Sequence, residues 1–290
     1  MKWISFQVSG KKEYGILMEK GQIFSSEQLF GESRPPSLLA YIENPQPILT
    51  PEEPPRFQVE DVMIEIPITP PNNIMAVGKN YYEHVLEMGS ENDVPEKMMI
   101  FTKSRNALLP HAGRIELHQS ITKQLDYEGE LAVVVGKKIK NATLDEADQA
   151  IFGFTILNDI TARDLQKQHK QFFIGKSLDT SAPIGPVILQ KNQPMADLSF
   201  SIQTFVNGEC RQNGTTDQLI IPITQIVAEL SQGHTLLPGD IIATGTPKGV
   251  GKGMVPPQFL KEGDQIEINI SDIGTLKNTV VRSTERKEEK

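Results

Sequence analysis

The sequence of 290 residues contains one cysteine, Cys210, and one tryptophan, Trp3. One cysteine excludes an internal disulfide and a cysteine-rich metal site. No apolar run reaches the roughly 20 residues of a membrane-spanning helix, and no apolar secretory segment follows Met1. From these absences we expect a cytoplasmic protein without a membrane partner.

Excess positive charge is also missing, because the net charge is −8 at pH 7. Sequence-independent binding to nucleic acid needs a basic surface, so we expect no nucleic-acid partner. With 38% hydrophobic and 23% charged residues, the composition is that of a globular protein with one large domain, or one domain and a small appendage. Aromatic residues make up only 6%, which leaves little surface for stacking sugars and disfavours a glycosidase.

Several catalytic and nucleotide-binding motifs are absent. Gly175-Lys176-Ser177 is not a phosphate-binding loop, because Lys170 stands where that motif needs glycine. The loop 245–253 lacks the serine or threonine that should follow Lys252, and no glycine fingerprint for a dinucleotide precedes a helix. There is no nucleophile elbow of a serine hydrolase. Cys210 closely follows a predicted Asn207-Gly208 hairpin turn, which gives no support for a nucleophile.

The strongest positive signal is the segment 126–136, which contains Glu128 and Glu130 and ends in a valine-rich run. It predicts a strand that is buried on both faces beyond Glu130. Alternation places the two glutamates on one face, with α-carbons roughly 6.6 Å apart. Two such carboxylates repel each other unless a cation lies between them, and Mg²⁺ or Mn²⁺ would suit them. A solvated strand end is the commoner explanation of an isolated Glu-x-Glu pair.

A short strand at 73–78 leads into a predicted helix at 79–89, with Asn80 as its N-cap. His84 and Glu87 are three residues apart and therefore share a helix face. The polar residues 90–96 that follow could form a mobile lid. A pair of this kind is more often a surface contact than a catalytic one.

A second apolar strand, 151–159, ends at Asp159, and a helix is predicted at 161–170 with Arg163 and Gln166 on one face. An N-cap role is the structural alternative for Asp159. The prolines within 42–55 exclude a helix or central strand there and indicate a linker. We therefore expect a small N-terminal domain with its linker at 1–66 and a catalytic domain at 67–290.

Taken in order, these stretches resemble the fumarylacetoacetate hydrolase superfamily over roughly residues 72–281. The segments that carry the resemblance are 77–81 with His84 and Glu87, 127–137, 158–166, 175–180, 206–209, and 239–247 with Thr246. The resemblance implies an α+β, predominantly β fold, a mixed β-sandwich roll, usually as a homodimer. It implies that Glu128, Glu130 and Asp159 bind Mg²⁺ or Mn²⁺.

The same resemblance implies catalytic roles for the dyad of His84 and Glu87 and for Lys176. It implies substrate contacts from Arg163 and Gln166, to which we add Lys79 and Thr246. A further aspartate ligand of the large eukaryotic hydrolases has no match here, which disfavours fumarylacetoacetate as the substrate.

Three carboxylates leave about half of an octahedral shell open for a small 2-oxo acid. The family reactions include decarboxylation and tautomerisation of oxaloacetate, hydrolysis of acylpyruvates, and isomerisation or decarboxylation of homoprotocatechuate-pathway acids. Oxaloacetate decarboxylation is favoured first, with Lys79, Lys103, Arg163 and Lys176 as candidate partners for a second carboxylate. Acylpyruvate or fumarylpyruvate hydrolysis is second, and a non-catalytic protein that keeps the fold for partner binding is the alternative outside enzymes.

Overall fold

The computed structural model describes residues 1–283, so residues 284–290 of the predicted domain 67–290 lie outside the described part. Its helices are α1 (Ser26–Phe30), α2 (Leu38–Glu43), α3 (Tyr82–Met88), α4 (Leu144–Ala150), α5 (Arg163–His169), α6 (Phe173–Lys176) and α7 (Ile223–Leu230). The strands of the N-terminal half are β1 (Lys2–Val8), β2 (Lys11–Leu17), β3 (Gln22–Ser25), β4 (Phe57–Gln58), β5 (Met63–Ile64), β6 (Ile74–Gly78), β7 (Met99–Lys103), β8 (Leu108–Leu109), β9 (Arg114–Glu116), β10 (Leu125–Asp126) and β11 (Gly129–Val135). Those that follow are β12 (Ile151–Asn158), β13 (Thr161–Ala162), β14 (Ala182–Gln190), β15 (Ser201–Val206), β16 (Glu209–Thr215), β17 (Ile241–Ala243), β18 (Gln265–Ile270) and β19 (Gly274–Val281).

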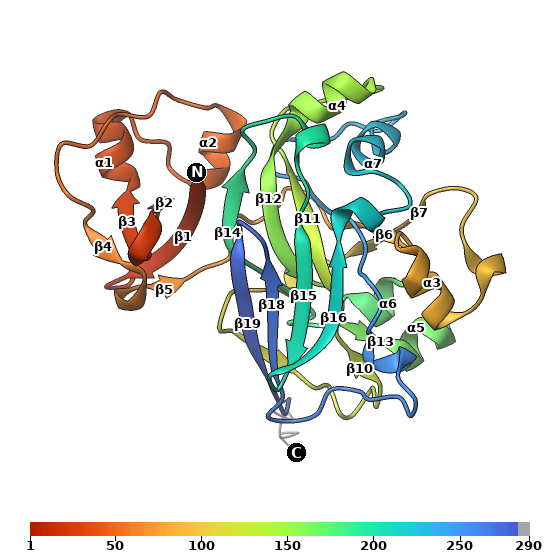
Figure 1. The fold of residues 1–290 in the computed structure, drawn as a ribbon. Coiled ribbons are helices and arrows are strands. Elements are labelled where there is room, and N and C mark those ends of the chain that lie inside the picture. The colour runs from red at the N-terminus through yellow and green to blue at the C-terminus, as the bar shows by residue number, and fades with distance from the viewer. Residues whose placement is uncertain (284–290) are drawn as a thin grey trace, which may run out of the picture.

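The fold is predominantly β, as the family resemblance implies, and its helices are short and peripheral (Figure 1). The larger sheet of the described residues has 12 strands and runs β4-β3-β2-β1-β14-β12-β11-β17-β6-β7, with β5 on β1 and β8 on β14. A smaller sheet, β16-β15-β18-β19-β9, faces part of it, and β10 pairs with β13. None of the helices has the length and apolar character to cross a bilayer, as far as residues 1–283 are concerned.

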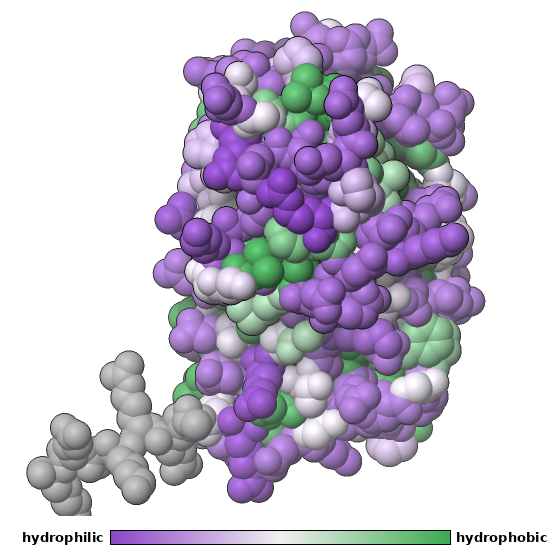
Figure 2. Space-filling view, turned by 90° about the vertical axis from the view of Figure 1, so that its left-hand side faces the viewer, coloured by the Kyte–Doolittle hydropathy of each residue, from purple (hydrophilic) through white to green (hydrophobic). Residues whose placement is uncertain are grey.

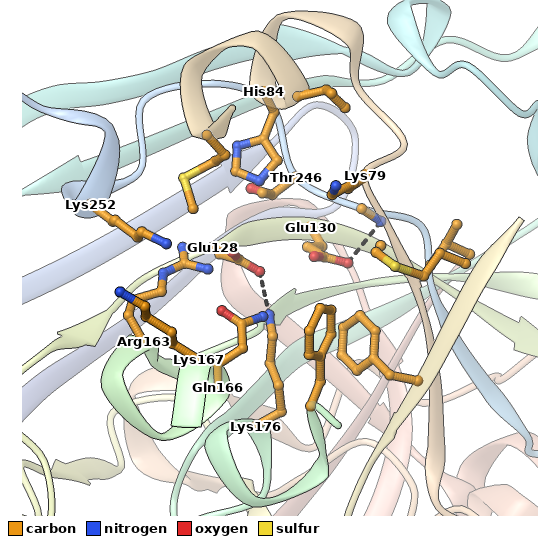
Figure 3. A pocket seen from close by; sticks show the side chains of 18 residues that line it. Lys79, His84, Glu128, Glu130, Arg163, Gln166, Lys167, Lys176, Thr246 and Lys252 are labelled. Carbon is orange, nitrogen blue, oxygen red and sulfur yellow. Dashed lines mark hydrogen bonds and ion pairs between the residues drawn. The ribbon is translucent and has the colours of Figure 1, made fainter. Parts of the chain in front are cut away.

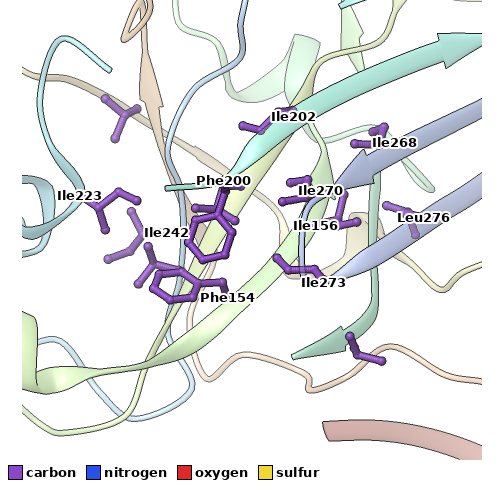
Figure 4. Packing of buried hydrophobic residues seen from close by; sticks show 14 of the residues in the cluster. Phe154, Ile156, Phe200, Ile202, Ile223, Ile242, Ile268, Ile270, Ile273 and Leu276 are labelled. Atoms are coloured by element: carbon purple, nitrogen blue, oxygen red, sulfur yellow. The ribbon is translucent and has the colours of Figure 1, made fainter. Parts of the chain in front are cut away.

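Of the predicted strand at 126–136, residues 129–135 form β11 and all seven are buried, whereas Asp126 belongs to β10, which pairs with β13. Leu131, Val133 and Val135 pack toward the smaller sheet, in a core that includes Ile202 and Ile268 (Figure 4 shows its centre). Its other face contributes to a second core on the far side of the sheet, through Ala132 and Val134. Two buried faces explain why the apolar run is continuous rather than alternating.

The N-terminal strands extend this sheet. Trp3 on β1 pairs in register with Ile188 on β14, and its indole N–H donates to the Gln190 side chain at 3.0 Å. The exposed side of this N-terminal region is mostly hydrophilic (Figure 2). The boundary at residue 66 stays a prediction, because the sheet runs through both predicted domains.

The proline-rich stretch does not link this region to the main body, which corrects the linker interpretation of 42–55. Ile42 is buried in α2, and the residues after the prolines form β4 and β5, which return to β3 and β1. The stretch therefore joins two elements of the same N-terminal region. Prolines disfavour helix interiors and central strands, but they do not show which elements a loop connects.

Two further local predictions can be compared with the structure. The hairpin at Asn207-Gly208 is confirmed between β15 and β16, with φ of 52° and 80° at the two turn residues. Asn80 does not cap α3, which begins at Tyr82. Its side chain instead accepts from the Ile221 N–H at 2.8 Å and donates to the Thr244 carbonyl at 2.9 Å. Asn80 therefore ties the segment before α3 to two distant loops.

Candidate active site

A cavity of about 280 Å³ opens beside β6, β7, α3 and α5 (Figure 3). All of the predicted site residues line it except Glu87, Lys103 and Asp159, which contact residues of its wall. Residues from distant parts of the sequence thus converge on one small pocket.

The register of β11 and β12 brings the three predicted metal ligands together. Gly129 pairs with Asn158 and Glu130 with Leu157, so the same register places Glu128 opposite Asp159, where the chain leaves β12. The Asp159 N–H donates to the Glu128 carbonyl at 2.8 Å. The three side chains, hereafter the acidic triad, are buried and offer carboxylate oxygens within 4.8 Å of one another.

Buried cations neutralise part of this negative charge. The Lys176 ammonium lies 2.6 Å from both Glu128 and Asp159, and 4.9 Å from the centre of the Phe101 ring. The Arg163 guanidinium contacts Glu128 at 2.7 Å. Although burial opposes ionisation, Arg163 and Lys176 hold the pKa of Glu128 well below its usual range.

Glu130 is the exception, since no salt bridge reaches it from the part of the chain that is described. Its carboxylate accepts the Gly245 N–H at 2.9 Å. Burial, together with repulsion from Asp159 and Glu128, raises its pKa well above the ordinary value. An all-oxygen donor set with one uncompensated carboxylate fits a hard divalent cation such as Mg²⁺ or Mn²⁺, which would share oxygens of Glu128 and Asp159 with Lys176.

His84 enters the cavity from α3, directly above Glu128 in Figure 3. Its Nδ1 lies 3.2 Å from the Glu87 carboxylate, and that carboxylate accepts the Gly249 N–H at 2.8 Å. A carboxylate accepts the proton of Nδ1, which leaves Nε2 as the basic nitrogen. Gly253 packs so closely on Glu87 that an added β-carbon would lie 2.3 Å from its carboxyl carbon, so the loop also positions the dyad.

Some predicted substrate contacts are already engaged elsewhere. Lys103 is fully buried, 2.7 Å from Asp159, and donates to the Ile160 carbonyl at 3.0 Å, so it cannot reach a ligand as suggested. The Thr246 hydroxyl donates to the Gly129 carbonyl at 2.9 Å, which favours a role in holding β11. Lys79 lines the cavity but pairs with Asp93 at 3.5 Å.

Three functional candidates escaped the sequence analysis. Asp126 is fully buried and contacts Arg163 at 2.9 Å while accepting the backbone N–H groups of Gly251 and Lys252. It precedes Glu128 by two residues within the predicted strand 126–136, and that spacing could have identified it. Lys167 also lines the cavity and follows Arg163 by four residues on the predicted helix, a spacing that could have identified it, whereas Lys252 had no such local signal.

Comparison with a family model and with known proteins agrees with the geometry of the site. Residues 73–281 match the family model described as fumarylacetoacetate (FAA) hydrolase C-terminal. Oxaloacetate tautomerase YisK of Bacillus subtilis is 51% identical over 225 residues, which are 77% of this chain and 75% of that protein. The solved structure of a fumarylacetoacetate hydrolase from Exiguobacterium antarcticum is 40% identical, with a TM-score of 0.86 over 98% of this chain and 100% of that one.

A third relative is 5-carboxymethyl-2-hydroxymuconate delta-isomerase of Mycobacterium smegmatis, whose crystal structure is 31% identical with a TM-score of 0.78. The alignment covers 98% of this chain and 100% of that one. The family model spans most of the chain, and the relatives share both sequence and fold with it. This chain therefore belongs to the fumarylacetoacetate hydrolase family.

Proposed function

We propose that the protein is an enzyme that tautomerises a small 2-oxo acid, with oxaloacetate as the first substrate to test. The observation that carries this proposal is the placement of a histidine base and a buried acidic triad on one small cavity. The volume of about 280 Å³ suits a ligand of a few carbon atoms.

Keto–enol conversion of a 2-oxo acid moves one proton from C3 to the 2-oxo oxygen and breaks no carbon–carbon bond. We assign removal of the C3 proton to His84 Nε2, while Glu87 orients the ring and stabilises its charged form. The Lys176 ammonium is suited to stabilise negative charge that develops on the 2-oxo oxygen. Gln166 and Arg163 lie beside it and complete the polar wall.

The acidic triad would hold Mg²⁺ or Mn²⁺, which when bound polarises a carbonyl as a Lewis acid. Lys103 stabilises the acidic triad through its ion pair with Asp159. This role is structural, since Lys103 does not line the cavity.

The names of two of the three relatives support proton transfer, whereas the relative from Exiguobacterium antarcticum is named a hydrolase. YisK is named as a tautomerase and the mycobacterial relative as an isomerase, and both reactions relocate a proton. Decarboxylation of oxaloacetate is the second candidate, because it needs the same electron sink and the same head-group site. Acylpyruvate hydrolysis requires in addition that His84 activates a water molecule.

The test follows three products from one enzyme preparation with Mg²⁺ or Mn²⁺. Loss of the enol absorbance of fresh oxaloacetate reports tautomerisation, pyruvate formation reports decarboxylation, and acetate release from acetylpyruvate reports hydrolysis. We expect the first rate to exceed the others. A dominant pyruvate signal would establish the decarboxylase instead, and no turnover of any substrate would favour a binding protein.

Substitution of His84 by alanine should lower the tautomerisation kcat by about 10²–10⁴-fold, the usual effect of a general base. The matched control is His234→Ala, because His234 is exposed and lies outside the cavity. Equal rates in His84→Ala and the control would contradict the assigned base.

A further inference from the structure

The cations that line the cavity divide into two groups. Arg163 and Lys176 are engaged with buried carboxylates, and Lys79 pairs with Asp93. Lys167 and Lys252 have no carboxylate within salt-bridge distance among residues 1–283, although both line the cavity. These two ammonium groups are therefore available to a ligand.

The backbone that carries Lys252 is held in place. Asp126 accepts the N–H of Gly251 at 2.8 Å and that of Lys252 at 3.0 Å, while it pairs with Arg163. A β-carbon on Gly251 would lie 2.0 Å from the Gln258 carbonyl oxygen, so this turn is tightly packed. The start of the Lys252 side chain is thus fixed next to Arg163, while its end is exposed at the rim.

Lys167 approaches the same place from α5, one helical turn after Arg163. Figure 3 shows Lys252, Arg163 and Lys167 gathered on one side of the pocket. Burial and the charge of Arg163 lower the pKa of Lys252 against the opposing charge of Asp126, and Lys167 lowers it further. An anion near these side chains would relieve that repulsion.

The rest of the wall offers no comparable site. Met88, Met99, Phe101 and Phe172 form its apolar part, which would not compensate a carboxylate. A substrate whose 2-oxo acid end lies at the acidic triad has one cationic direction in which to extend, toward Lys167 and Lys252.

We propose that Lys167 and Lys252 bind the distal carboxylate of the substrate and so select 2-oxo diacids over 2-oxo monoacids. This inference rests on the proposed function for the placement of the 2-oxo acid head group. It has a chemical consequence, because decarboxylation removes the negative charge of the distal carboxylate. Ammonium groups that stabilise this carboxylate in the ground state oppose its loss and favour proton transfer at C3.

The experiment compares Lys167→Met and Lys252→Met with Lys261→Met, in the intact chain with Mg²⁺. Lys261 is an exposed lysine outside the cavity and controls for the loss of one positive charge. Each enzyme is assayed with oxaloacetate and with acetylpyruvate, in which an uncharged acetyl group replaces the distal carboxylate. Loss of enol absorbance measures both reactions.

We expect each cavity variant to lower kcat/KM for oxaloacetate by about tenfold, mainly through KM, as for loss of a charged hydrogen bond. The kcat/KM for acetylpyruvate should stay within about twofold of wild type. The inhibition constant of oxalate, which occupies only the head-group site, should also stay within about twofold. The inference would be overturned if the ratio of kcat/KM for oxaloacetate to kcat/KM for acetylpyruvate were the same in both cavity variants as in Lys261→Met. That result would leave the proposed function intact.

Calorimetric titration with fresh oxaloacetate and with pyruvate tests the diacid site separately from the proposed reaction. If the wild type turns over neither substrate but binds oxaloacetate more tightly than pyruvate, and the cavity variants abolish that preference, the diacid site stands and the proposed reaction fails. If the wild type has no preference for the diacid, the diacid site itself is refuted.

Discussion

Glu130 occupies an unusual position among the buried charges. Its neighbours Glu128 and Asp159 each contact at least one cation, whereas Glu130 accepts only the Gly245 N–H among the polar contacts within residues 1–283. A buried carboxylate without a cationic partner destabilises the folded protein, unless it is protonated or binds a metal. The neutral isostere Glu130→Gln separates these effects.

We predict that Glu130→Gln leaves the metal-free free energy of unfolding within about 1 kcal/mol of wild type, or raises it, because only an uncompensated charge is lost. Wild type at a Mn²⁺ concentration of 100 times Kd should gain about 2.7 kcal/mol, and the variant should lose most of this gain. Urea unfolding with EDTA and with Mn²⁺ measures both values. Full stabilisation of the variant by Mn²⁺ would contradict a ligand role for Glu130.

Substitution of Lys103, in contrast to that of Glu130, should destabilise the folded protein. Substitution by methionine keeps much of the side-chain volume but deprives the fully buried Asp159 of one of its two ion pairs. We predict a loss of about 3 kcal/mol in the free energy of unfolding, as for breaking a buried ion pair. Lys261→Met, an exposed control, should change it by less than about 0.5 kcal/mol. Equal stability of the two variants would show that the Lys103 pair contributes nothing net.

At the scale of elements, α3 carries the catalytic candidate His84 but has limited structural support. It has seven residues, far fewer than the roughly 12–15 that an isolated helix needs for stability. Its attachments include the buried Val85, the Glu87–Gly249 hydrogen bond and the exposed Lys248–Glu83 ion pair. The helix therefore depends on the glycine-rich loop and on whatever occupies the cavity beneath His84.

We predict that amide hydrogens of residues 80–96 exchange more slowly when oxalate or pyruvate is bound with Mg²⁺, because the ligand adds contacts under α3. Exchange measured by mass spectrometry tests this. The fully buried strand β11 is the internal control and should show no change. Equal protection of 80–96 with and without ligand would rule out a ligand-dependent lid.

At the scale of the molecule, the shared sheet predicts that the N-terminal region and the main body unfold together. The only tryptophan, Trp3, lies in the N-terminal region and is fully buried against a cluster that includes Tyr41. Its fluorescence reports the N-terminal region, whereas far-UV circular dichroism reports the whole chain. We predict coincident urea transitions for the two probes. Separate transitions would instead support independent units at 1–66 and 67–290.

The homodimer that the family resemblance implies stays a prediction. Sedimentation equilibrium over a range of concentrations measures the mass directly. The same measurement with Mn²⁺ and oxalate shows whether ligand binding is linked to assembly. A single monomer mass under all conditions would contradict the prediction.

Local sequence pattern was sufficient for those predictions that depend only on residues close to one another in the sequence. The parity of Glu128 and Glu130, the three-residue spacing of His84 and Glu87, and the turn at Asn207-Gly208 are each set by one element. The cavity contains both glutamates and His84, and Glu87 contacts the histidine, so local spacing identified much of the candidate site. The same pattern could not distinguish an N-cap from a distant hydrogen bond at Asn80.

The pairing of charges was decided only by tertiary structure. Sequence chemistry left Lys103, Arg163 and Lys176 equivalent as partners for a substrate carboxylate. The register of β11 with β12 and the approach of β7 and α6 then placed buried carboxylates against all three. Ion pairs form between groups that the fold brings within a few ångströms, whatever their separation in sequence. For this reason the sequence determined which residue types are present for metal and acid–base chemistry, and the fold determined which cations are left for the substrate.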